Sequence, residues 1–342
     1  MLQINQFTRM NYFKVILKLV LCCTVLLSCD NDNSKTESNL YLLTSSNTSG
    51  KISYTNLLAA TPKVESFTIV SADADGISYD PISDAFLLAS RSNNRLEAYA
   101  RLRTTSDAGL DNLTLISSSS GTDFTNARET AVFNDIVVVA QDQSASNSLT
   151  NKLFVYQKSS TGFTLLKTFS TTFKLWGIHL DGPDLYAVVD LTGDIAQFKN
   201  ILNANGGAIT PTKRISIEGI NRIHGMTYSA SDDVMILTDI ASATSASDGG
   251  FVVLPSFSNL FALTANGGTL KIDKQLRVYG PNSQLGNPVD VAYDKQSQQI
   301  FIAENLKNAG QVMHFRFPSQ SGDSAPLFVR AEAGVSSIFA TR

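Results

Sequence analysis

The sequence predicts an all-β fold, a six-bladed β-propeller that closes by pairing its last strand with its first strands. Short apolar strands recur along the chain, with no sustained helical periodicity. The openings of successive repeats are 54, 47, 48, 64 and 46 residues apart, close to the roughly 40–50 residues of one blade. The sixth opening, residues 334–340, has no second strand behind it, and residues 39–43 supply the missing partner. A ring of seven blades is the alternative.

Each repeat is predicted to contain four strands in the same order. First strands open at or beside Gly76, Thr130, Gly177, Gly225, Val289 and Val335. Second strands are runs of apolar residues that suit strands buried on both faces: 86–89, 136–140, 185–189, 234–238 and 299–303. Third strands follow at 95–99, 152–156, 194–198, 250–254 and 311–315, and fourth strands at 113–116, 165–169, 213–217, 275–279 and 327–330. Two predicted surface loops, 241–249 and 259–268, explain the longer fourth repeat.

Part of the repeat resembles a known propeller family. Residues 288–294, 300–305 and 310–315 resemble an NHL-type repeat, and residues 75–80 with 92–96 follow the same plan. The resemblance covers residues 39–342 as architecture and implies a strand order, not a chemistry. Together with the N-terminal segment, the chain looks like a lipid-anchored NHL/YVTN-like propeller.

The first 28 residues are predicted to be a lipoprotein signal peptide. The apolar run from Val15 to Leu27 is too short to span a membrane. Its ending, Leu26-Leu27-Ser28-Cys29, resembles the lipobox of bacterial lipoproteins, which implies that Cys29 is acylated, for example with palmitate. An ordinary signal peptide with a chance cysteine is the alternative. Residues 29–38 are then a lipidated tether and residues 39–342 the propeller, which contains no cysteine.

The tether and the charge balance bear on location and partners. Asp30 and Asp32 resemble the surface-export signal of Bacteroidota lipoproteins, which implies an outer-membrane lipoprotein exposed at the cell surface; retention at the inner membrane is the alternative. Of 27 basic residues, Arg9, Lys14 and Lys18 lie in the signal, which leaves 24 against 30 acidic ones. Without a basic run, nucleic acid is excluded as a partner. We expect a monomeric domain that meets the membrane through its lipid.

A ligand site is expected at one mouth of the central channel. In propellers of this plan, residues that open the first strands and residues that end the second strands point toward the same mouth. A tryptophan there could stack a planar ligand or a sugar, with polar side chains around it. The predicted ligand-binding residues are Trp176, His224, Arg222, Arg128, Asp75 and Glu129. The alternative for Trp176 and His224 is packing between blades.

Carboxylates expected at the same mouth could hold Ca²⁺, which binds six to eight oxygen atoms. The six-bladed gluconolactonase-like family holds a divalent ion at this place. The nearest analogues here are Glu304, Asn305, Asp190 and Asp239. The alternative is that these side chains accept hydrogen bonds from backbone amides in the turns after each second strand.

The sequence favours a binding protein without catalysis. It contains no glycine-rich phosphate loop, no His-Glu-x-x-His and no Gly-x-Ser-x-Gly motif. We expect a tethered propeller that presents its channel mouth to a small molecule, a glycan or a protein. Lipid-tethered propellers that pass ligands to outer-membrane transporters are the nearest precedent. The alternatives are a divalent-metal lactonase or hydrolase, and a structural or adhesive module.

Overall fold

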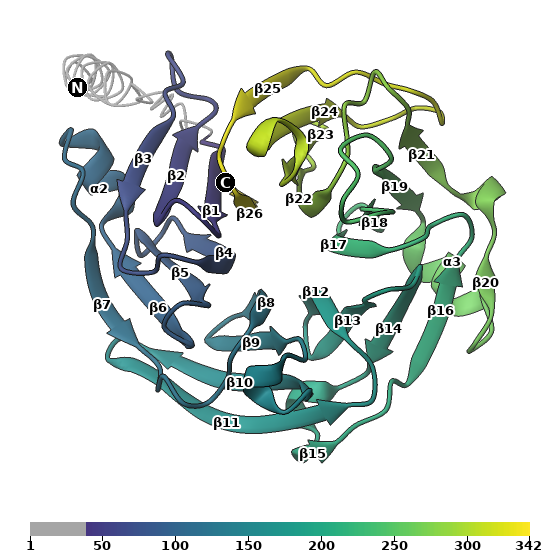
Figure 1. The fold of residues 1–342 in the computed structure, drawn as a ribbon, viewed down its shortest axis with the longest axis horizontal. Helices are drawn as coiled ribbons and strands as arrows, with labels where there is room; N and C mark the ends of the chain where they lie inside the picture. The colour runs from purple at the N-terminus through teal and green to yellow at the C-terminus, as the bar shows by residue number, and fades with distance from the viewer. Residues whose placement is uncertain (1–38) are drawn as a thin grey trace, which may run out of the picture. The chain divides into compact units, whose positions relative to one another are not determined.

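Six β-sheets stand like blades around a central channel in the computed structural model (Figure 1). The structure describes residues 39–342, which form one unit from Asn39 to Arg342. The six predicted blades are confirmed, and the seven-bladed alternative is wrong. The predicted signal peptide (1–28) and the tether with Cys29 (29–38) lie outside the described residues.

In every blade the innermost strand lines the channel and the others follow toward the rim. Three blades consist of β26 (Val335–Thr341), β1 (Tyr41–Ser46), β2 (Lys51–Asn56) and β3 (Glu65–Thr68); β4 (Ala74–Asp80), β5 (Ala85–Ser90), β6 (Arg95–Ala100) and β7 (Thr114–Ser118); and β8 (Ala127–Phe133), β9 (Ile136–Gln141), β10 (Asn151–Ser159), β11 (Gly162–Thr171) and β15 (Gly207–Ala208). The other three consist of β12 (Leu175–Asp181), β13 (Asp184–Val189), β14 (Asp194–Phe198), β16 (Lys213–Ile217) and β20 (Thr269–Leu270); β17 (Ile223–Ser229), β18 (Val234–Asp239), β19 (Gly250–Pro255) and β21 (Leu276–Tyr279); and β22 (Pro288–Asp294), β23 (Gln299–Glu304), β24 (Gln311–Arg316) and β25 (Phe328–Ala331).

The core lies between the blades, and β9 shows why its sequence is continuously apolar. Val137, Val138 and Val139 are all fully buried. Because side chains alternate across a strand, Val138 packs in the core shared with the β12 blade, whereas Val137 and Val139 pack in the core shared with the β4 blade. A strand covered on both faces therefore needs apolar residues at every position.

The last strand closes the ring, as predicted. β26 pairs antiparallel with β1, from Tyr41 opposite Thr341 to Ser45 opposite Ser337. Arg342 then donates two hydrogen bonds of 2.7 Å to Asp294 of the β22 blade. The C-terminus accordingly lies beside β1 and β26 in Figure 1.

All six innermost strands are irregular near their beginnings. Each shifts register once against its neighbour, at a β-bulge. At this level the innermost strands also approach each other closely. A Cβ atom on Gly177 would overlap the carbonyl oxygen of His224, and one on Gly225 would lie 2.6 Å from the Cα atom of Asp290. The bulges and glycines therefore narrow the channel here, and the bulges re-aim the side chains around them.

Short helices lie between strands: α2 (Leu102–Asp107), α3 (Phe257–Leu263) and the 3₁₀ turns η1 (Ala145–Asn147), η2 (Ile201–Asn203), η3 (Ile272–Lys274) and η4 (Lys307–Ala309). Residues 241–249 contain no helix or strand, as predicted. The prediction of a surface loop over 259–268 is wrong in its first half, because α3 occupies it and buries Phe261 against Tyr186, with ring centres 5.6 Å apart. A helix this short shows no readable periodicity.

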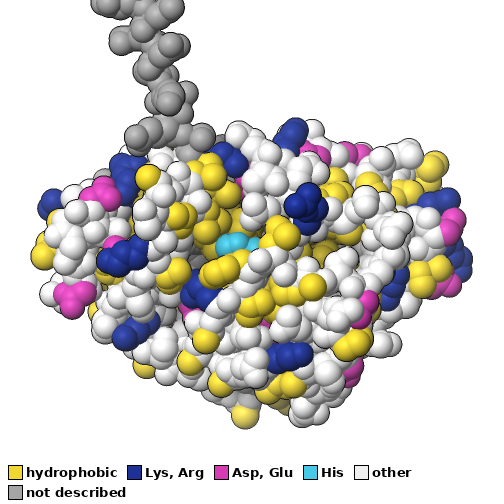
Figure 2. Space-filling model, turned by 90° about the horizontal axis from the view of Figure 1, so that it is seen from above, with side chains coloured by type: hydrophobic (Ala, Val, Ile, Leu, Met, Phe, Trp, Pro, Cys, Tyr) yellow, Lys and Arg dark blue, Asp and Glu magenta, His cyan; other side chains and the backbone are white. Residues whose placement is uncertain are grey.

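The outer wall of the ring is mixed in character. Figure 2 shows one side of it, where apolar side chains gather around a histidine and charged side chains of both signs are scattered. No basic stripe is visible on this side. Within residues 39–342, none of the helices has the length and apolar character needed to cross a membrane.

Candidate functional site

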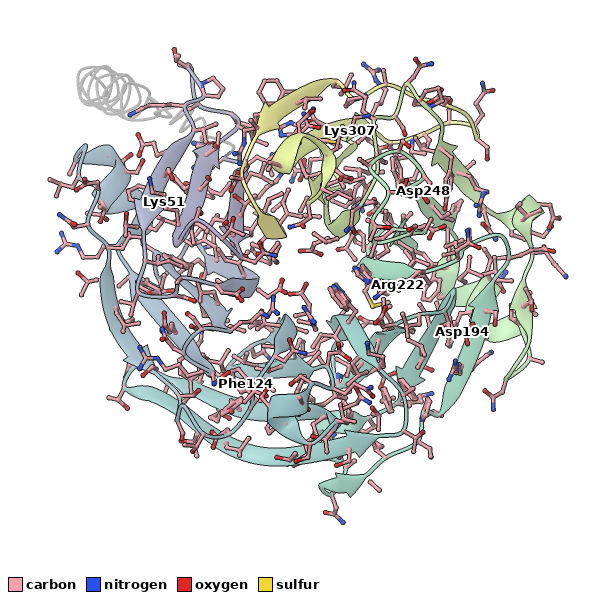
Figure 3. The ribbon with its side chains drawn as sticks, in the orientation of Figure 1. Lys51, Phe124, Asp194, Arg222, Asp248 and Lys307 are labelled. Carbon is pink, nitrogen blue, oxygen red and sulfur yellow. The ribbon has the colours of Figure 1, made fainter. Side chains whose placement is uncertain are left out.

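The channel has two parts, which meet at the level of the bulges. On one side lies a cluster of charged and aromatic residues, which we call the mouth cluster. Its members are Arg128, Lys174, Trp176, Arg222, His224, Asp142 and Asp190. On the other side is a cavity. Figure 3 shows Arg222 at the edge of the central opening.

Trp176 is the centre of the mouth cluster. Its ring stacks on His224 with ring centres 3.7 Å apart and planes 12° apart. The Cζ atom of Arg128 lies 4.1 Å from the Trp176 ring centre. Two groups this close to one ring centre cannot share a face without overlapping, so they cover opposite faces. A ligand could therefore stack on Trp176 only by displacing Arg128 or His224.

Acidic and basic side chains surround this stack. Arg222 donates hydrogen bonds to both carboxylate oxygens of Asp190, at 2.7 and 3.2 Å. Lys174 lies 3.4 Å from Asp190 and 3.5 Å from Asp142, and Arg128 lies 3.6 Å from Asp142. Burial alone would raise the pKa of Asp190, but contacts with His224 and Arg222 outweigh it and hold that pKa well below its ordinary value.

His224 is neutral at physiological pH. It is 3% exposed, and burial lowers its pKa to about 4 against the opposing pull of Asp190. Its Nε2 atom lies 3.3 Å from Oδ1 of Asp190, but off the direction of a hydrogen bond. Within residues 39–342, neither ring nitrogen has a hydrogen-bond partner.

The structure brings four of the six predicted ligand-binding residues into one cluster: Trp176, His224, Arg222 and Arg128. Asp75 lies beside it, 3.9 Å from Arg91, and burial raises the pKa of Asp75 to about 8. Glu129 instead lines the cavity on the other side of the bulges.

The four candidate metal ligands are not brought together. Glu304 accepts hydrogen bonds of 2.8–3.1 Å from the backbone amides of Gly286, Asn287, Leu306 and Lys307. Asp239 accepts from the amides of Asn221, Arg222 and Ala241. Asn305 donates to the carbonyl of Val335, and Asp190 belongs to the mouth cluster. Across residues 39–342, no three His, Cys, Asp or Glu side chains are grouped as metal ligands would be. The backbone-acceptor alternative therefore describes Glu304 and Asp239.

The cavity has a volume of about 930 Å³ and lies in the second part of the channel. All six blades contribute to its wall through the later parts of their innermost strands, residues 77–80, 129–132, 178–180, 226–227, 290–293 and 338–340. It extends outward as a cleft between the β4 and β8 blades, where Ala85, Ala98 and Ala100 leave space.

Two carboxyl groups lie where the cavity meets the bulges. Glu129 and Asp290 occupy the same register, each paired with an alanine of the second strand, and they belong to opposite blades. Asp290 accepts hydrogen bonds from the Ser337 hydroxyl (2.8 Å) and the amides of Ile338 and Val291 (both 2.7 Å). Burial raises the pKa of Asp290 to about 6 and that of Glu129 well above its ordinary value, and for Glu129 the nearby Asp290 and Asp75 add to the effect.

The sequence prediction did not include Asp290, Lys174 or Asp142 among its site residues. Asp290 could have been found by aligning the repeats on the strand pairing, which places it level with Glu129. Lys174 precedes its strand by one residue, and nothing in the repeat pattern marks it.

The overall arrangement is shared with solved structures. A chain of a nidogen–laminin complex is 14% identical, with a TM-score of 0.60 over 88% of this chain and 98% of that one. The present protein is therefore a six-bladed β-propeller. A Bacteroides fragilis protein described as a candidate 6-phosphogluconolactonase matches the propeller at 11% identity and a TM-score of 0.59, over 91% and 100% of the two chains. A Bacteroides caccae protein of unknown function matches at 10% and 0.55, over 89% and 100%.

These identities show the fold alone. No protein-family model matches the sequence, and no curated protein matches it. The function of the propeller must therefore be argued from its channel.

Proposed function

We propose that this propeller is a non-catalytic binding protein that holds a small molecule in its channel cavity. The observation that carries the proposal is the cavity itself. Its volume of about 930 Å³ lies within the range of about 300–1,000 Å³ that is typical of ligand pockets. Its wall is mainly apolar, with Ile77, Ile178, Met226, Val291 and Ile338 around a few polar groups. That composition suits an organic molecule with an apolar body and a polar part.

The cavity is a better ligand site than the mouth cluster. Both faces of Trp176 are already covered, and the cations of the cluster face Asp142 and Asp190. A ligand at the mouth would have to break these contacts, whereas a ligand in the cavity would displace only solvent. We infer that the mouth cluster packs the blades together at that end of the channel.

The rival functions have less support. A divalent-metal lactonase needs converging ligands, but Glu304 and Asp239 are engaged with backbone amides. A purely adhesive module would not need an internal cavity lined by all six blades.

A screen of small molecules by thermal shift tests the proposal. We expect ligands that raise the melting temperature of the wild type but not of Ala340→Trp, because Ala340 lines the cavity and a large ring there would fill it. Ala331→Trp, on the exposed outer strand β25, is the matched control and should keep the response. Hits that bind Ala340→Trp as well as the wild type would place the ligand elsewhere.

We also propose that Cys29 carries a lipid that anchors the propeller in the cell envelope, facing outward from an outer membrane. The lipobox-like ending and the acidic residues behind it support this. Replacement of Cys29 by Ser should release the protein from the membrane fraction, and protease treatment of intact cells should degrade the wild type.

Co-purification from solubilised membranes would test the further proposal of an outer-membrane transporter as partner.

A further inference from the structure

We propose that the cavity selects an organic cation: an amine with an apolar body, whose ammonium group lies against Glu129. This inference rests on the proposed function and adds the chemical class of the ligand. It follows from the charges around Glu129, from the carboxyl oxygen of Glu129 for which residues 39–342 supply no hydrogen-bond partner, and from the shape of the cleft.

Glu129 has an incomplete set of partners. Its Oε1 atom accepts a hydrogen bond of 2.7 Å from the amide of Thr130. The hydrogen bonds found within residues 39–342 include none to its other carboxylate oxygen, although the side chain lines the cavity. The charged groups that act on it are Asp290 and Asp75, which are both acidic. Without a cation beside it, burial and these acidic neighbours raise the pKa of Glu129 and keep the group protonated. A bound ammonium group would stabilise the ionised form, so Glu129 would release its proton when the ligand binds.

The remaining charges of the cavity agree with a cationic ligand. Asp290 lies level with Glu129 on the opposite blade. Toward the outer end the wall carries Asp80 and Asp135 against one base, Lys158. His179, which also lines the cavity, stays neutral because burial lowers its pKa to about 4. The wall therefore carries four carboxyl groups against one basic group, a balance that favours a cationic ligand over an anionic one.

The cleft between the β4 and β8 blades suits the apolar body. Ala85, Ala98 and Ala100 form one wall, and Ile116 beside them is 48% exposed. An exposed isoleucine next to small side chains offers apolar area that a ligand could cover. The ligand would thus be elongated, with its ammonium group in the channel and its body along the cleft.

Three fluorescent probes with one aromatic body test this inference: dansylcadaverine, which carries a free amine, neutral dansylamide, and dansylglycine, which carries a carboxylate. Binding would be measured by fluorescence enhancement and calorimetry with the wild type, Glu129→Gln and Asp248→Asn. Glu129→Gln keeps the shape of the side chain and removes its ability to ionise. Asp248 lies in an exposed loop, so Asp248→Asn is a charge-matched control. Melting curves confirm that each variant is folded.

We expect the amine probe to bind the wild type about tenfold or more tightly than the neutral probe, as a charged hydrogen bond implies. Glu129→Gln should remove that preference and Asp248→Asn should retain it. Equal binding of all three probes, unaffected by Glu129→Gln, would overturn the inference and leave the proposed cavity site standing. Displacement of the amine by submillimolar Ca²⁺ would also overturn it, in favour of a metal ion. Binding of no probe at millimolar concentration would overturn both. If Glu129→Gln does not fold, the preference of the wild type between probes decides alone.

Discussion

Asp190 shows how single residues hold the mouth cluster together. Its side chain is fully buried, and it accepts two hydrogen bonds from Arg222 while Lys174 and His224 lie within 3.4 Å. A buried anion with such partners stabilises the fold only while all of them are present.

Asp190→Asn should lower the free energy of unfolding by about 2–4 kcal/mol at pH 7, because it leaves Arg222 partly buried without its anion. The folded-state pKa of Asp190 lies below its unfolded value, so this stabilisation is present above about pH 4 and is lost as the pH falls through the folded-state pKa. Urea unfolding at neutral and acidic pH should show the difference from the wild type shrinking in acid. Asp194→Asn, at a more exposed pair with Arg214, should cost less than about 1 kcal/mol. A constant difference across pH would contradict this account.

The sole tryptophan reports on His224. Because burial lowers the pKa of His224 to about 4 and its ring stacks on Trp176, protonation should quench the fluorescence with a midpoint near pH 4. His224→Gln should lose this step. Circular dichroism over the same pH range would verify that the fold persists. A midpoint near 6.5, the ordinary value for histidine, would show that the ring is solvated.

At the scale of elements, the β-bulge decides which part of the channel a side chain reaches. The alternation of apolar residues predicted the strands, but the one extra residue that a β-bulge adds to a strand leaves this alternation almost unchanged. It does change which side of the strand each later residue faces. This is why Glu129 was expected at the mouth beside Arg128 but lines the cavity instead. The cavity was not predicted, because its wall needs the curvature and register of all six innermost strands.

Gly177→Ala tests the close approach of innermost strands. The added methyl group would overlap the His224 carbonyl oxygen, so we expect a loss of about 1–3 kcal/mol in the free energy of unfolding. Gly322→Ala, where no atom lies within 4 Å of the added methyl group, should stay within about 0.5 kcal/mol of the wild type. Equal unfolding curves for the two variants would show that the strands can separate without cost.

At the scale of the whole molecule, the sequence predicted the ring and its closure because repeat spacing and strand order are visible in it. Which residues meet inside the channel depends on distances between blades, and spacing along the chain does not contain these. Asp290 and Glu129 are 161 positions apart in the sequence and opposite each other in the ring.

Removal of residues 334–342 should abolish cooperative folding rather than fray one end. It deletes the innermost strand of a blade and uncovers β1. The free energy lost when Val335 and Ile338 are no longer buried is a large fraction of a typical free energy of unfolding, about 5–15 kcal/mol. Circular dichroism melting would measure it. Arg342→Ala, which removes only the contacts with Asp294, should melt within a few degrees of the wild type. A truncated protein with an unchanged melting curve would disprove closure through β26.

The pairing of β26 with β1 also sets an order of events during synthesis. The chain is made from its N-terminus, so β1, β2 and β3 emerge before the other strands of the propeller, whereas their innermost partner, β26, is made after all of them. Until residues 335–341 leave the ribosome, β1 is a free sheet edge, and free edges invite pairing with other chains. In every other blade the innermost strand is made before the three strands that follow it outward. The vulnerable period for the propeller is therefore the interval before β26 is available, when a chaperone would have most to protect.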